Sequence, residues 1–216
     1  MRTILLFFVL FLLVSQARAV KYRTYTLAEL ARKADVVIVA KTVNRNGVIH
    51  ANVLRSLKGI PRADIIVDSF AAREEEKAHF NNDETVILFL QKEENGRRLL
   101  LGYGDQGKWP KAVGKWPYSD VHVVPIQKVE KAVETLLDLD RMSNPDSKAE
   151  KIQSLLSSKD AFDQSCALEY LYASCDQKLK DAVKSEVDAL HGASKDKHIQ
   201  VFCDSVSRTN TSEHIP

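Results

Sequence analysis

This chain has few cysteines, almost no net charge and none of the common catalytic motifs. It has three cysteines, none before Cys166, and 31 Lys and Arg face 29 Asp and Glu. It has no G-x-S-x-G elbow, no S-x-x-K in a serine-hydrolase context, no phosphate loop and no H-E-x-x-H. A nearly neutral chain has no field to attract polyanions, so nucleic acid is excluded as a partner. No cofactor is expected, and a non-enzymatic protein is favoured.

The only long apolar run lies at the start and predicts a signal peptide over residues 1–19. Arg2 precedes an unbroken apolar run from Ile4 to Val14, and Ala17 and Ala19 occupy the positions that a signal peptidase reads. The run is too short for a bilayer span, which takes about 20 residues. Cleavage removes two of the 31 basic residues and leaves 29 of each sign. The sequence therefore predicts a periplasmic or secreted product without a membrane span.

Short apolar runs separated by turn residues predict a β-barrel within residues 20–125. A capping box at Thr26 and Glu29 predicts a short helix before the barrel. Strands are expected over 35–43, 48–57, 64–70, 85–90 and 97–103, with an Asn-Gly turn between the first two. Short strands paired mostly with their sequence neighbours are typical of a small closed or half-closed barrel.

From residue 126 the apolar residues recur every three or four positions, which predicts a helical bundle over 126–208. Pro125 suits a helix start, and the first apolar stripe is Ile126, Val129, Ala132, Val133, Leu136 and Leu137. Further helices are expected over 147–157, 161–173, 177–190 and 195 to about 207. The polar residues 209–216 predict a flexible tail. The expected fold class is α+β: a small OB-like antiparallel β-barrel followed by a C-terminal helical bundle.

Four pieces of the first half resemble a group of exported bacterial proteins of unknown function. The pieces are LAELARKADVVIVAKTV, VLRSLKGIP, DETVILFLQ and GDQG, and they cover roughly Leu27 to Gly107. That group is similar in fold to the amino-terminal, OB-type domain of the tissue inhibitors of metalloproteinases. Those inhibitors chelate zinc through an amino-terminal cysteine, whereas the mature chain here would begin at Val20. The resemblance implies the fold and not zinc-directed inhibition.

The second half contains a further resemblance. DQSCALEYLYA followed by LKDAVKSEVDAL resembles one helix pair of a HEAT-type repeat. A solenoid needs at least about three repeats to bury a continuous core, so a small bundle packed on the barrel is favoured.

The only two tryptophans lie in a four-residue sequence that occurs twice. Gly-Lys-Trp-Pro at 107–110 returns at 114–117. One interpretation is an aromatic ligand-binding patch at the barrel mouth, formed by Tyr103, Trp109, Trp116 and Tyr118. The favoured interpretation is that Trp109 and Trp116 fill the seam between the barrel and the helices.

Carboxylates and a histidine gather only near residues 74–79. If that stretch is helical, Glu75 and His79 share a face and form half of a metal site. Two ligands do not make a site, so a solvated charged loop is favoured and no metal is expected.

The cysteines leave the disulfide pairing open. An oxidising compartment permits one bridge, Cys175 to Cys203 or Cys166 to Cys203. The alternative is three buried thiols that act as small apolar residues.

These observations favour a non-enzymatic binding or protein-interaction module whose partner is an extracytoplasmic protein or a glycan. One alternative is an envelope hydrolase whose site lies between barrel and helices and uses His79 or His122 beside a carboxylate. The other is a protease inhibitor that acts through a protruding loop, residues 71–83, without zinc chelation.

Overall fold

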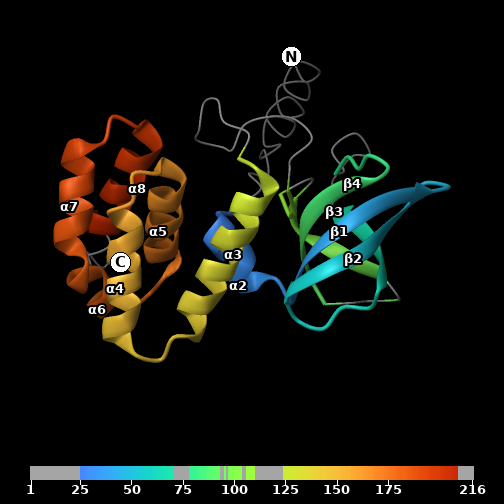
Figure 1. The fold of residues 1–216 in the computed structure, drawn as a ribbon, viewed down its shortest axis with the longest axis horizontal. Helices are drawn as coiled ribbons and strands as arrows, with labels where there is room; N and C mark the ends of the chain where they lie inside the picture. The colour runs from blue at the N-terminus through green and yellow to red at the C-terminus, as the bar shows by residue number, and fades with distance from the viewer. Residues whose placement is uncertain are drawn as a thin grey trace, which may run out of the picture.

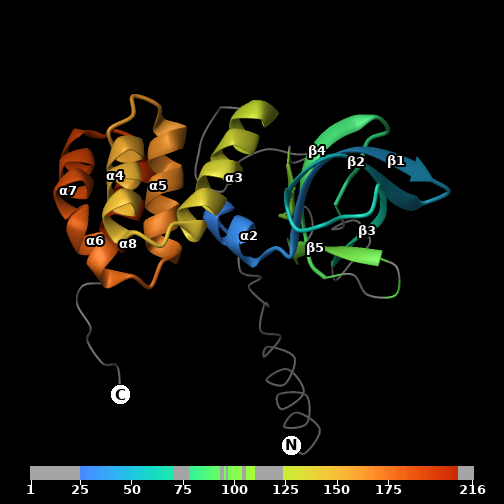
Figure 2. The same ribbon diagram turned by 60° about the horizontal axis from the view of Figure 1, so that its bottom comes forward.

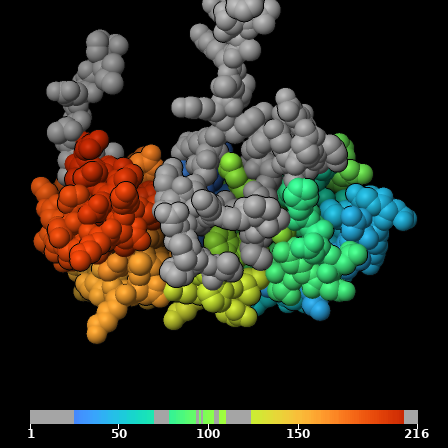
Figure 3. All heavy atoms as spheres, turned by 90° about the horizontal axis from the view of Figure 1, so that it is seen from above, coloured from blue at the N-terminus to red at the C-terminus, as the bar shows by residue number. Residues whose placement is uncertain are grey.

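The computed structural model describes residues 25–70, 78–92, 95, 97–103, 106–109 and 124–208. The strands are β1 (Val36–Arg45), β2 (Val48–Lys58), β3 (Asp64–Phe70), β4 (Glu84–Leu90), β5 (Arg97–Tyr103) and β6 (Lys108–Trp109). The helices are α2 (Leu27–Lys33), α3 (Ile126–Arg141), α4 (Pro145–Leu156), α5 (Ala161–Ala173), α6 (Gln177–Ala182), α7 (Lys184–Ala193) and α8 (Lys197–Arg208). The expected α+β class, a small barrel followed by helices, is confirmed. The barrel and helices α4–α8 lie at opposite ends, with α2 and α3 between them (Figures 1 and 3).

The sheet closes into a five-stranded barrel. The strand order β1-β2-β3-β5-β4 returns to its start because β1 also pairs with β4, and β6 adds a short pairing to β4. All neighbours are antiparallel except β3 and β5, which run parallel. A ring with an odd number of strands cannot alternate direction all the way round, so one pair must be parallel. The barrel is therefore mixed, and this one pairing differs from the antiparallel barrel that we expected.

Strands β1 and β4 are buried on both faces, which explains their nearly continuous apolar sequences. Alternate residues, such as Ile38 and Leu88, fill the barrel interior. The residues between them, such as Val39 and Phe89, join a second cluster that includes the helices. Successive side chains of a strand point to opposite faces, so these two strands separate the two cores. The β1–β2 hairpin turns at Asn46 and Gly47, both of positive φ, as Asn-Gly turns require.

Helix α5 lies at the centre of the helical part. Six consecutive residues from Cys166 to Leu171 are buried, because α5 packs against α2, α4 and α8 on different sides (Figures 1 and 2). A helix that is buried all round shows no single apolar stripe. The predicted helix over 177–190 is divided at Val183 into α6 and α7.

Three helices begin with the same local arrangement. A serine hydroxyl accepts from the amide of the aspartate two residues later, at 3.1 Å, and the aspartate carboxylate accepts from an amide of the first helical turn. The pairs are Ser158–Asp160 before α5, Ser174–Asp176 before α6 and Ser194–Asp196 before α8. Before α5 and α8 the pattern extends to Ser-Lys-Asp-x-x-x-Gln, and the glutamine side chain donates to the serine carbonyl at 2.7 and 2.8 Å.

Helix α2 precedes the barrel in sequence but packs on α3 and α5. Its capping box is formed by Thr26 and Glu29. The buried carboxylate of Glu169 in α5 accepts from the Leu27 amide at 2.8 Å. At the other end, the Lys58 ammonium at the end of β2 donates to the Ala31 and Arg32 carbonyls at 3.0 and 2.8 Å. An anion at the amino end and a cation at the carboxyl end both match the helix dipole.

Candidate functional site

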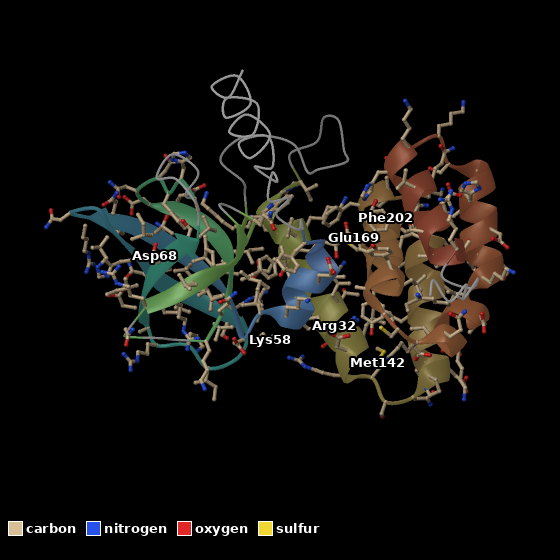
Figure 4. The ribbon with its side chains drawn as sticks, turned by 180° about the vertical axis from the view of Figure 1, so that it is seen from behind. Arg32, Lys58, Asp68, Met142, Glu169 and Phe202 are labelled. Atoms are coloured by element: carbon tan, nitrogen blue, oxygen red, sulfur yellow. The ribbon has the colours of Figure 1, made fainter. Side chains whose placement is uncertain are left out.

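A cavity of about 380 Å³ lies at the end of the barrel that carries the β1–β2 turn. Its lining comes from that turn, the second half of β3, residues 78–80 and Arg97 at the start of β5. Asp68, one of the lining residues, lies on the barrel far from helices α4–α8 (Figure 4). Ligand pockets typically enclose about 300–1,000 Å³, so this cavity can hold a small ligand or one part of a larger one.

The strand register brings residues of β2, β3 and β5 onto one outward face beside the cavity. In β3, Ile65 and Val67 are buried in the barrel interior, so Ile66 and Asp68 point outward. Ile66 stands opposite His50 of β2 on one side and Arg97 of β5 on the other. Residues opposite one another on neighbouring strands share a face, so this row places two basic side chains around one apolar side chain.

Two polar side-chain pairs lie on this face. The Arg97 guanidinium is 3.6 Å from the Asp68 carboxylate, and the Asp68 carboxylate also accepts from the Ser69 amide at 2.8 Å. One strand away, His50 Nδ1 lies 3.0 Å from a carboxylate oxygen of Asp64. Arg97 is more than half exposed, so its pair with Asp68 leaves donor groups accessible to a ligand.

Residues 78–80 form one wall of the cavity. The Ala78 amide donates to Ser69 Oγ at 3.0 Å, which ties the wall to the end of β3. Phe80 and Ala78 also pack against the apolar core inside the barrel. The wall therefore joins the cavity to the barrel interior.

The lining combines charged and apolar side chains. Arg97 and Asp68 offer paired donors and acceptors, while Val48, Ile66 and Phe80 offer apolar surface. Among the described residues, no three His, Cys, Asp or Glu side chains are grouped so that they could hold a metal ion.

The four aromatic residues predicted as a ligand site do not all fall within the described chain. Trp116 and Tyr118 lie outside the described residues. Tyr103 ends β5, where only its backbone is described. Trp109 in β6 is 8 % exposed and belongs to the cluster shared by barrel and helices. Its indole nitrogen donates to the Val124 carbonyl at 3.4 Å, just before α3, so Trp109 occupies the seam.

Most of the other predicted site residues lie outside the described part of the chain. Glu75 and His122, and residues 71–77 of the predicted inhibitory loop, lie outside the described residues. His79 is exposed and lines the cavity.

The three cysteines are free thiols in this structure. Cys175 is exposed, whereas Cys166 and Cys203 are buried. Burial raises the pKa of Cys166 well above its usual value, and the nearby Glu169 carboxylate adds to this. Burial raises the pKa of Cys203 to about 11. The two buried thiols are therefore protonated near neutral pH and are poor nucleophiles.

A buried polar pair between α5 and α8 was not predicted from the sequence. His198 Nε2 lies 3.9 Å from Glu169 Oε1, and both side chains are almost fully buried. The His198 ring also packs edge-on against Phe202, 4.7 Å between centroids. Glu169 and Phe202 lie close together at the helical end (Figure 4). Burial lowers the pKa of His198, so the ring is neutral near pH 7.

Sequence reasoning also missed the Asp68–Arg97 pair and Phe80. The alternation Asp64-Ile65-Ile66-Val67-Asp68 signals an outward polar face, which could have indicated Asp68. Arg97 is its neighbour only through the parallel β3–β5 register, which local patterns do not encode.

Comparison of the chain with models of known protein families, with curated proteins and with solved structures gives no match. Within the described part of the chain, no helix is both long enough and apolar enough to cross a membrane.

Proposed function

We propose that this protein is an exported, non-enzymatic binding module whose OB-type barrel takes an extracytoplasmic glycan in the cavity beside β2 and β3. The observation that carries the proposal is the position of the cavity. OB-type barrels are small five-stranded Greek-key barrels that bind oligosaccharides and oligonucleotides on the face of strands 2 and 3 and at the adjoining loops. The strand order of this barrel and the lining of its cavity fit that description.

Charge favours a glycan over a nucleic acid. The mature chain would carry 29 basic and 29 acidic side chains, since two of the 31 basic residues lie in the predicted signal peptide. The cavity repeats this balance, because Arg97 is paired with Asp68. Sugar hydroxyls match such mixed donors and acceptors, whereas polyanions need a surplus of positive charge.

Phe80 and Ile66 supply apolar surface for the flat faces of sugar rings. Aromatic and aliphatic lining with a few placed polar groups is the usual composition of small-ligand sites. A polypeptide segment is the second candidate partner, because the same polar groups also match peptide amides.

Titration of the mature protein with soluble glycan fragments from cell envelopes tests the proposal. We expect Arg97→Ala and Asp68→Asn to weaken binding at least about tenfold, which is the effect of one lost charged hydrogen bond. Arg208→Ala is the matched control, because this arginine of α8 is 81 % exposed and far from the cavity. Binding that resists both cavity variants would contradict the site, and capture of a polypeptide instead would favour the second candidate.

A further inference from the structure

Lys108 is buried inside the barrel, although it is a charged residue. It pairs with Leu88 across β6 and β4, and Leu88 belongs to the interior core, so the Lys108 side chain enters the barrel. Its side chain has no exposed surface. The ammonium lies 2.9 Å from Glu84 Oε1 and 5.5 Å from the centre of the Phe80 ring.

Glu84 connects this ammonium to the chain that follows the cavity wall. Its second carboxylate oxygen accepts from the Asn81 amide at 3.2 Å. The Thr42 hydroxyl donates to the Asn81 carbonyl at 2.9 Å, and Asn82 Oδ1 accepts from the Asn44 amide at 2.7 Å. Residues 81–84 are therefore held by two residues of β1 and by Lys108.

Phe80 lies directly before this anchored segment and forms part of the cavity lining. The wall is thus fixed at both ends: Ser69 holds Ala78, and the Glu84–Lys108 pair holds Asn81. Between these ends, the Phe80 ring has the cavity beside it and the Lys108 ammonium within cation–π distance.

Stability alone does not require this pair. Replacing a buried ion pair by apolar residues of similar volume is often neutral or stabilising. What the charges supply here is geometry, because Glu84 uses one oxygen for Lys108 and the other for the backbone of the wall.

We infer that Lys108 and Glu84 are positioning residues for the cavity: they fix Phe80 and the 78–80 wall, and so set the affinity for the ligand without contacting it. This inference rests on the proposed function of the cavity. It gives Lys108 of the first Gly-Lys-Trp-Pro sequence a role different from that of Trp109 beside it, which belongs to the seam.

The test is the double variant Lys108→Met/Glu84→Gln, which removes both charges and keeps the side-chain volumes close to the originals. We expect it to fold, with unchanged circular dichroism, and to bind envelope glycan fragments at least about tenfold more weakly. Amide hydrogen exchange of residues 78–82 should become at least about tenfold faster, while that of helix α5, which does not contact the wall, stays unchanged. The control is Asp138→Asn/Arg141→Met, which removes an exposed i,i+3 pair of α3.

Unchanged affinity in the double variant overturns the inference, whether or not exchange becomes faster. If the double variant does not fold, Phe80→Leu replaces it, because it keeps both charges and removes the ring; wild-type affinity in Phe80→Leu also overturns the inference. If neither the wild type nor Arg97→Ala binds glycans, the proposed function fails. Amide hydrogen exchange in the double variant then tests whether Lys108 and Glu84 position the wall. Faster exchange at residues 78–82 supports this role, and unchanged exchange overturns it.

Discussion

The helical part and the barrel are held together by different kinds of polar contact. Each of three helices is capped by an aspartate directly before it, with a serine two residues further back, as at Ser158 and Asp160. The barrel instead depends on residues that are distant in sequence. Its ring closes where β1 meets β4, and its cavity wall is held by Lys108, 24 residues after its partner Glu84. Local caps confine the effect of a change, whereas long-range pairs spread it.

The two regions also differ in where their polar side chains lie. Three aspartates of the helical part lie directly before helices, where they accept from backbone amides. The barrel brings polar groups from four separate segments to one cavity. The barrel, whose ring is closed by strands distant in sequence, is therefore also the region that forms the cavity. The helices pack against it through the shared core.

The largest loss of stability is expected for Trp109, which lies in the seam between the barrel and the helices. Trp109→Ala should lower the free energy of unfolding by about 3–5 kcal/mol, the usual cost of removing a large buried side chain. Because Trp109 packs with both regions, barrel and helices should lose stability together in urea unfolding followed by circular dichroism and by backbone NMR. Trp109→Phe, which keeps a ring, should cost much less. A barrel that weakens while the helices keep their midpoint would show that the seam does not couple them.

Replacing one glycine in each region by alanine should change stability in opposite directions. In Gly107→Ala the new Cβ would meet backbone atoms of Leu101 and Phe89 at 2.7–2.9 Å, so we expect a loss of about 1–3 kcal/mol. In Gly192→Ala on α7 the new Cβ meets nothing within 4 Å, and alanine is the better helix former, so we expect a gain of up to about 1 kcal/mol. Thermal unfolding of both variants measures the difference. Equal effects of the same sign would contradict the contrast in packing.

The smallest effect should be pH dependence from the buried His198 ring. Its folded pKa is lowered by burial, so the unfolded chain binds the proton more readily. Stability from this group is therefore present above about pH 6.5, the ordinary pKa, and is lost as pH falls toward the folded value. The loss is at most about 1.4 kcal/mol per pH unit.

The groups that face His198 are Glu169 from α5 and Asp196 from its own helix start. Urea unfolding at pH 7.5 and pH 5.5 should show a smaller acid loss in His198→Gln than in the wild type. An equal loss in both proteins would assign the acid sensitivity to other groups.

The sequence predicted the regular elements better than the site. Five strands and most helices follow from apolar periodicity, and α5 was predicted at its observed bounds, 161–173. The parallel β3–β5 pairing follows from closing an odd ring, which no local pattern records. The cavity depends on that pairing, so Arg97 could not be joined to Asp68 before the topology was known.

Two buried charges were missed for a related reason. Glu169 lies in an apolar helix and Lys108 follows a glycine in a turn-like stretch, and both positions resemble surface polar residues. Their burial is acceptable only because each has a distant partner, the Leu27 amide for Glu169 and Glu84 for Lys108. The repeated Ser-Lys-Asp-x-x-x-Gln sequence, in contrast, was readable and indicates two similar helix starts.

The two ends of α2 have a consequence for the order in which the chain is completed. This helix has seven residues, too few to persist alone in water, and it would leave the ribosome before nearly everything it depends on. Two of its last carbonyls accept hydrogen bonds from Lys58, and its first amide donates to Glu169; both partners come later in the chain. A chain that has not yet reached α5 therefore lacks the carboxylate that accepts from the first amide of α2.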